Sequence, residues 1–280
     1  TSPDLARQIA NAHTIFNVLV SLMFIPFVGA LVWLCERIIP KRERELEPRH
    51  FFDVKMLNFA QLALREAERE VTNIAEKTLT MLNLSKSALV DEDIKAADIV
   101  LRLEDEVDEY CDETELFIDK IREEDLPEKQ KLWRIKLLNI IVDIERIGDM
   151  TNNLAEFGIR RLNEQIPFSE TANEELRKLF EKVEETYLTA ITALKQKSEL
   201  HAQQAVDLED EVDVLERKCK NAHIRRTTEG ICAPEADVMF TEILRNLERI
   251  GDHADNIAYD VLDTFYNHFG IGTRKRTPNF

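Results

Sequence analysis

Two short motifs occur twice in this chain, in the same order and at nearly the same offset. The hexapeptide LEDEVD stands at 103–108 and again at 208–213, and the pentapeptide ERIGD stands at 145–149 and again at 248–252. Self-similarity at a fixed offset is typical of one supersecondary unit that is used more than once and packs on its copies. The repeat therefore predicts two related units, with the boundary between them near 165–167.

Both units are expected to be helical. The 280 residues include only 7 Gly and 8 Pro, which is about half the usual share of these two residue types. Apolar positions such as Leu57, Leu64 and Val71 recur at helical spacing, and no comparable alternating runs indicate strands. Prolines and capping residues divide the sequence into six expected helices, three in each unit: 53–84, 91–124, 128–163, 171–199, 202–229 and 235–269.

An apolar segment precedes the repeats. Residues 18–35 carry no charge, and a helix of this length extends about 27 Å, close to the thickness of a hydrocarbon core. A signal peptide is the alternative, but its cations would precede the apolar run, whereas here a basic cluster follows it: Arg37, Lys41, Arg42, Arg44 and Arg49. By the positive-inside rule we expect a helix in the inner membrane and everything after about residue 40 in the cytoplasm.

The expected fold class is all-α, with one transmembrane helix followed by two tandem three-helix bundles. The expected organisation has five parts: a transmembrane segment at 1–40, a basic juxtamembrane linker at 41–52, one repeat at 53–166, the second repeat at 167–270, and a basic tail at 271–280.

Charge and cysteine content argue against several classes of protein. A formal net charge of −17 at pH 7 argues against nucleic acid as a partner, because a phosphate-binding surface needs clustered cations. The four cysteines have no CxxC or zinc-knuckle spacing, so a reducing compartment fits better than a disulfide framework. The sequence contains no Ser/His/Asp arrangement, no phosphate-binding glycine loop and no di-iron Glu-x-x-His pair. We therefore expect a protein that is not an enzyme.

The repeated motifs carry the candidate metal ligands. Each motif has a Glu and an Asp four residues apart, on one face of a helix: Glu104 with Asp108, Glu145 with Asp149, Glu209 with Asp213, and Glu248 with Asp252. Like charges at this spacing destabilise an isolated helix. If the two motif helices of a repeat face each other, four carboxylates converge, which suits Mg, Ca, Mn or iron. The alternative is a solvated acidic face held by Arg146 or Arg249.

Other residues near the motifs extend each candidate site. Asp105 and Asp210 are fallback ligands, since the second acidic residue of each hexapeptide could point nearer to the cation than the first. Four further side chains are expected around the ligands or in contacts between helices, with a surface position and direct ligation also open for the histidine: Asn152, Asp255, Asn256 and His253. Gly148 and Gly251 lie inside helical sequence, where Gly costs about 1 kcal/mol relative to Ala, and a close helix crossing would explain them.

The two motifs, extended in the second copy as 246–257, resemble the signature of the PhoU family. The resemblance covers roughly 52–269 and implies two three-helix bundles whose motif carboxylates bind metal clusters, with iron or zinc associated with the family. It implies metal ligands among Glu104, Asp105, Asp108, Glu145, Asp149, Glu209, Asp210, Asp213, Glu248 and Asp252. The first copy departs from the fuller pattern, with Asp143 where the second has Asn246 and Met150 where it has His253, so its site is expected to be weaker or to bind differently.

Residues 8–17, QIANAHTIFN, lead into the apolar segment and resemble the last membrane helix of bacterial sodium/phosphate cotransporters of the type II related family. This resemblance implies a C-terminal fragment of a sodium-dependent phosphate symporter with a regulatory, metal-binding PhoU-like domain. Its partners would be the membrane, the remainder of the transporter domain, and the transported sodium and phosphate. The alternatives are a membrane-tethered signalling adaptor that binds a separate transporter or a sensor kinase, and a metal-buffering helical bundle. The oligomeric state stays open, with a homodimer as one option.

Overall fold

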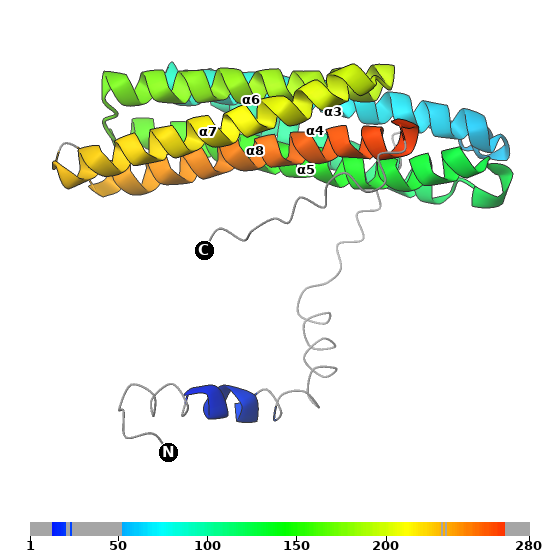
Figure 1. Cartoon of the computed structure of the whole chain (residues 1–280), viewed down its shortest axis with the longest axis horizontal. Helices are drawn as coiled ribbons and strands as arrows, with labels where there is room; N and C mark the ends of the chain where they lie inside the picture. The colour runs from blue at the N-terminus through cyan, green and yellow to red at the C-terminus, as the bar shows by residue number, and fades with distance from the viewer. Residues whose placement is uncertain (1–12, 21–22, 24–51, 231, 233, 267–280) are drawn as a thin grey trace. The chain divides into compact units, whose positions relative to one another are not determined.

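The computed structural model describes residues 13–20, 23, 52–230, 232 and 234–266 (Figure 1). The chain divides into two units, residues 1–51 and residues 52–280. In the first unit, residues 13–20 are helical. In the second, the described residues form six long helices joined by short turns and contain no strand, so the prediction of an all-α chain is confirmed for them.

Each repeat consists of three helices. The first contains α3 (Ala60–Val90), α4 (Ile94–Asp119) and α5 (Glu128–Asn163), and the second contains α6 (Glu170–Gln196), α7 (Glu199–Thr228) and α8 (Pro234–Tyr266). Two short 3-10 turns, η2 (Val54–Asn58) and η3 (Glu123–Asp125), precede α3 and α5. Within each repeat every helix packs against the other two, and the six helices run along a common direction (Figure 1).

Polar side chains set where the helices begin. Asp93 accepts hydrogen bonds from two backbone N–H groups at the start of α4, and Ser198 accepts one at the start of α7. The break expected between 84 and 91 is present but lies later, at 91–93, because α3 continues to Val90. The buried Ser85 hydroxyl donates to a backbone carbonyl inside the helix and so is compatible with helical structure. The helix expected to begin at residue 91 begins instead at Ile94, with Asp93 as its cap.

The two repeats pack on each other along two seams, α3 against α6 and α5 against α8. Across the α5–α8 seam, Asn256 donates to Asp143 at 3.0 Å, and Asn153 donates to Asn246 at 3.4 Å. The early part of each helix therefore meets the late part of its counterpart, which gives this seam an approximate two-fold relation. The buried apolar residues of both repeats form one continuous core.

The same ion pair joins the first two helices of each repeat. Lys77 Nζ lies 2.7 Å from the Glu106 carboxylate, and Lys182 Nζ lies 2.9 Å from the Glu211 carboxylate. Lys182 and Glu211 follow Lys77 and Glu106 by the same number of residues that separates the two copies of LEDEVD. LEDEVD therefore occupies equivalent places on α4 and α7.

The predicted membrane helix at 18–35 lies mostly outside the described residues, which include only 18–20 and 23 of it. In the part of the chain that the structure describes, no helix combines the length and the apolar character needed to cross a membrane. The predicted linker at 41–51 and the basic tail at 271–280 also lie outside the described residues.

Candidate metal centre

The two repeated motifs face each other inside each repeat. LEDEVD lies on α4 and α7, and ERIGD lies on α5 and α8. A Cβ added to Gly148 would lie 3.5 Å from Val107 Cγ1, and one added to Gly251 would lie 3.2 Å from Val212 Cγ1. The motif helices therefore lie against each other in both repeats. The predicted close crossing is confirmed at Gly251, whereas a Cβ at Gly148 would make only ordinary van der Waals contact.

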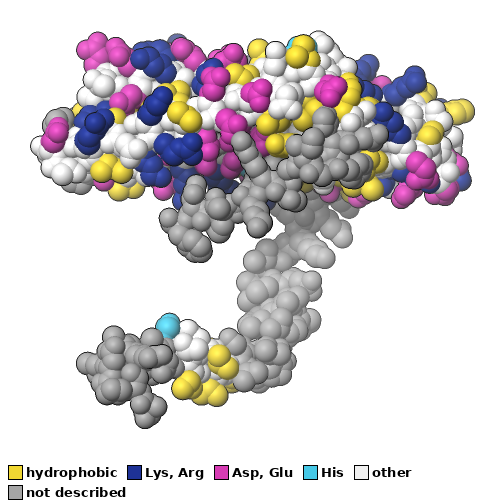
Figure 2. Space-filling view, in the orientation of Figure 1, with side chains coloured by type: hydrophobic (Ala, Val, Ile, Leu, Met, Phe, Trp, Pro, Cys, Tyr) yellow, Lys and Arg dark blue, Asp and Glu magenta, His cyan; other side chains and the backbone are white. Residues whose placement is uncertain are grey.

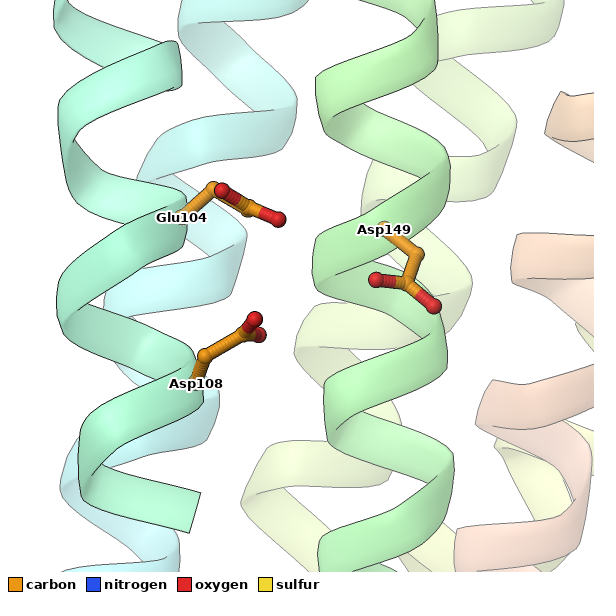
Figure 3. Close-up of side chains that lie close together, drawn as sticks. All are labelled: Glu104, Asp108 and Asp149. Atoms are coloured by element: carbon orange, nitrogen blue, oxygen red, sulfur yellow. The ribbon is translucent and has the colours of Figure 1, made fainter. Parts of the chain in front are cut away.

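In the first repeat this packing assembles a group of carboxylates. One oxygen atom from each of Glu104, Asp108 and Asp149 lies within 4.8 Å of the other two. Glu104 and Asp108 point from α4 toward Asp149 on α5 (Figure 3). Together with the neighbouring Glu145, we call these residues the first cluster. Cations held by carboxylates have metal–oxygen distances of roughly 2.0–2.6 Å, so a small closure of these oxygens would surround one.

The first cluster concentrates negative charge in a partly buried place. Burial, and then the charge of Asp108, raises the pKa of Glu104. Burial and then Asp149 raise the pKa of Glu145. Arg146 lies 3.5 Å from Asp149, but both of these side chains are well exposed, so the pair is screened by water. A bound cation would relieve the crowding of the carboxylates.

The second cluster, Glu209, Asp213, Glu248 and Asp252, occupies the equivalent place between α7 and α8. Glu209 is only 8% exposed, and burial followed by the charge of Asp213 raises its pKa to about 8. Burial and then Asp252 raise the pKa of Glu248 to about 7. Among the described residues, only the first cluster brings three acidic oxygens within 4.8 Å. The second cluster is thus the more buried one but is less tightly assembled.

The remaining acidic and amide candidates take different places around the clusters. Asp105 and Asp210 are exposed on the outer sides of their helices. Asp255 adds to the negative charge that raises the pKa of Glu209. Its counterpart in the first repeat, Asn152, has a buried Oδ1 for which the described part of the chain provides no hydrogen-bond donor. A cation or an ordered water near the first cluster would satisfy that oxygen.

His253 and Asn256 contact Asp143 across the α5–α8 seam. His253 Nδ1 lies 2.6 Å from Asp143 Oδ1, and Asn256 donates to the same oxygen at 3.0 Å. The repeated motifs alone did not predict this role of Asp143. The available signal was that Asp143 and His253 both depart from the repeat, whose other copy has Asn246 and Met150 at these positions.

The donor set of the two clusters fits a hard or borderline cation. It consists of carboxylates, to which Asn152 and Asp255 add further oxygen atoms, and it includes no thiolate. Such donors suit Mg, Ca, Mn or iron better than zinc, which more often takes nitrogen and sulfur ligands. Acidic and basic side chains are interspersed on the face shown in Figure 2. Burial and convergence distinguish the clusters, because surface charge alone is widespread.

A duplicated three-helix unit with facing acidic motifs defines a recognisable class of helical-bundle protein. The model of the PhoU domain matches residues 71–158 and 176–261, one stretch in each repeat. The matched residues make up more than half of the chain. The chain belongs to the PhoU domain family.

Named relatives and solved structures agree with this assignment. A phosphate-specific transport system accessory protein, PhoU homolog 1 of Thermotoga maritima, is 30% identical over 203 residues, which cover 70% of this chain and 87% of that protein. The crystal structure of PhoU from Pseudomonas aeruginosa superposes with a TM-score of 0.69 at 22% identity and covers 73% of this chain and 97% of that one. The crystal structure of PhoU from Streptococcus pneumoniae, titled a phosphate transport system regulatory protein, superposes with a TM-score of 0.67 at 17% identity. The match covers 74% of this chain and 97% of that one.

A longer relative matches more of the chain. YjbB of Escherichia coli, named as a candidate inorganic phosphate export protein, is 22% identical over 263 residues, which cover 92% of this chain and 48% of YjbB. The YjbB protein of Salmonella typhimurium is also 22% identical, and 47% of its length is covered. The chain therefore spans about half the length of these relatives. The sodium symport implied by the cotransporter resemblance finds no support in the relatives' names.

The expected location in the inner membrane needs correction. The solved PhoU chains are covered almost completely by the helical bundle, at 97% of their length. The six long helices from α3 to α8 are members of that bundle, and among all described residues no helix is long and apolar enough to cross a membrane. The prediction of an inner-membrane location is therefore wrong for the part of the chain that the structure describes.

Proposed function

We propose that this chain is a PhoU-type accessory domain that regulates phosphate transport, and that its two carboxylate clusters bind the cations on which regulation depends. The observation that carries the proposal is the convergence of Glu104, Asp108 and Asp149 from two helices, within 4.8 Å of one another. The repetition of both motifs in the second half supports it, because a solvated acidic face needs no such repetition.

The residues supply binding and positioning. Carboxylates from α4 and α5 would hold a cation in the first cluster, and carboxylates from α7 and α8 would hold one in the second. A cation would neutralise the buried Glu209 and the partly buried Glu248 and draw the paired helices together. This favours a regulatory role. The names of relatives as accessory and regulatory proteins support, at the family level, the prediction that the chain is not an enzyme.

A more specific context is that the chain is the regulatory part of a longer phosphate transport protein. The YjbB match covers 92% of this chain. Residues 52–280 make up a smaller share of the chain than this, so the match also includes part of the segment at 1–51. This supports a PhoU-type regulatory domain that is joined to a phosphate-translocating domain, without the sodium symport that the cotransporter resemblance implied. A separate transporter or a sensor kinase is the alternative partner, and a homodimer is a further possible assembly.

Elemental analysis of protein purified without chelator tests cation binding. The variants E104Q/D108N and E209Q/D213N neutralise the first and the second cluster, respectively. The matched control is E106Q/E211Q, which removes the same number of charges from the same two hexapeptides but at exposed positions paired with lysines. We expect stoichiometric metal in the parent and the control, and loss of part of that metal in each cluster variant. Equal trace metal in all four proteins would contradict the proposal.

The regulatory role requires a second measurement. Cells that carry the full-length protein with both clusters neutralised should show phosphate uptake or efflux that no longer responds to the supply of phosphate or cation. Cells that carry E106Q/E211Q should respond like the parent. An unchanged response in the cluster variant would mean that cation binding does not regulate phosphate transport, which would contradict the proposed role.

A further inference from the structure

A polar network occupies one half of the α5–α8 seam, and the equivalent place in the other half has different side chains. The His253 imidazole and the Asn256 amide both contact Asp143 Oδ1, at 2.6 Å and 3.0 Å. The side chains of His253 and Asp143 are only 18% and 14% exposed. The contact is therefore directional and shielded from water.

The other half of the seam holds a neutral pair at the corresponding positions. Asn246 corresponds to Asp143, and the buried Met150 corresponds to His253. Across the seam, Asn246 accepts a 3.4 Å hydrogen bond from Asn153, and within α8 it donates to the Glu242 carbonyl at 2.8 Å. The two departures from the repeat thus fall on residues that are partners across the seam. They compensate each other and leave the carboxylate ligands of both clusters unchanged.

The network lies directly beside both clusters. Asp143 stands two residues before Glu145 on α5, and His253 follows Asp252 on α8. Residues one or two positions apart point to different sides of a helix. One face of α5 therefore carries cluster residues toward α4, and one face of α8 carries them toward α7. On another face of the same turns, α5 and α8 contact each other through the network.

Each of these turns packs against the partner helix of its own repeat. A Cβ at Gly148 would lie 3.5 Å from Val107 Cγ1, and a Cβ at Gly251 would lie 3.2 Å from Val212 Cγ1. The first-cluster oxygens come from both α4 and α5 and lie within 4.8 Å of one another, so a cation that draws them together would pull on both helices. Because the core behind α5 is continuous and closely packed, a displacement of α5 would act on α8 across the seam.

We propose that the Asp143–His253–Asn256 network couples the two carboxylate clusters, so that cation occupancy of one changes the affinity of the other. This inference rests on the proposed cation binding. Coupling between binding sites is reciprocal, and its usual size is about 5-fold to 150-fold in affinity.

Titration with Mn²⁺ alone, followed calorimetrically, tests the coupling. The affinity of the second cluster is measured with the first cluster intact and with it neutralised by E104Q/D108N. The comparison is repeated in D143N/H253M, which gives the seam the Asn and Met pair that its other half already contains, and in N153A, a control that removes the hydrogen bond of that other half. Circular dichroism verifies that each variant folds.

In the parent and in N153A, we expect neutralising the first cluster to change second-cluster affinity by about fivefold or more. In D143N/H253M the change should fall below about twofold, while each cluster still binds Mn²⁺. A change of the same size in D143N/H253M and in the parent would overturn the inference, as would a parent without coupling. Mn²⁺ binding to neither cluster would overturn the proposed function as well, so the two failures are distinguishable.

Discussion

Glu209 is an acidic side chain that the fold removes from water and surrounds with other carboxylates. Its pKa rises from 4.5 to about 8, first because of burial. The folded protein therefore holds this proton more tightly than the unfolded chain does. The stability that the neutral carboxyl group contributes is fully present below about pH 4.5 and is lost as the pH rises through about 8.

The variant E209Q should remove much of this pH dependence in chelator-treated protein. The free energy of unfolding of E209Q should be close to that of the parent at pH 5 and higher by about 2 kcal/mol at pH 8.5, because the amide cannot ionise. Urea unfolding at the two pH values measures the difference. The exposed E211Q serves as the control and should follow the parent at both pH values. A parent whose stability rises between pH 5 and pH 8.5 would contradict the assignment.

At the scale of elements, α3 and α5 approach closely at Gly158. A Cβ at this position would lie 2.8 Å from the carbonyl oxygen of Ala88, a backbone atom that cannot turn aside. We expect G158A to lower the free energy of unfolding by about 2 kcal/mol, since overpacking outweighs the better helix propensity of alanine.

The control for this prediction is G148A, where the nearest atom would lie 3.5 Å from the added methyl group. Its free energy of unfolding should change by less than about 1 kcal/mol in either direction. Thermal or urea unfolding of both variants provides the comparison. Equal effects of the two substitutions would mean that α3 can shift to accommodate the methyl group.

Local sequence signals predicted the elements well where a strong signal stands at a boundary. The third expected helix, 128–163, matches α5, because Pro127 stands directly before its first residue. The turn between α6 and α7 lies earlier than expected, since Lys197 adopts a left-handed conformation with φ of 51° that usually calls for Gly or Asn. No local pattern specifies which non-glycine residue accepts that conformation.

The candidate site was only partly predictable for a similar reason. Exact repetition of the acidic motifs identified residues such as Glu104 and Asp149, and their helical spacing placed each pair on one face. The direction of His253 and the role of Asp143 depend on how the two repeats pack against each other. That packing joins residues 110 positions apart, so neither the spacing nor the periodicity of one helix encodes it.

At the scale of the whole molecule, residues 52–266 should unfold as one cooperative unit. The apolar core runs through both repeats without interruption, and the fully buried Tyr187 of the second repeat lies with its hydroxyl 2.6 Å from the Thr78 hydroxyl of the first. Urea unfolding should give the same midpoint by far-ultraviolet circular dichroism and by Trp133 fluorescence in a W33F background. Two separate midpoints would show that the repeats are stable independently.

The Asp143–His253 pair, which is present in only one half of the α5–α8 seam, limits how one repeat could be replaced by a copy of the other. A chimeric chain built from two copies of the first half would set Asp143 opposite Met150 twice and leave two shielded carboxylates without a histidine. A chain built from two copies of the second half would set His253 opposite Asn246 twice, which an amide tolerates. After the duplication that the repeat implies, the halves have diverged into complementary parts, and only one of them is suited to pair with itself.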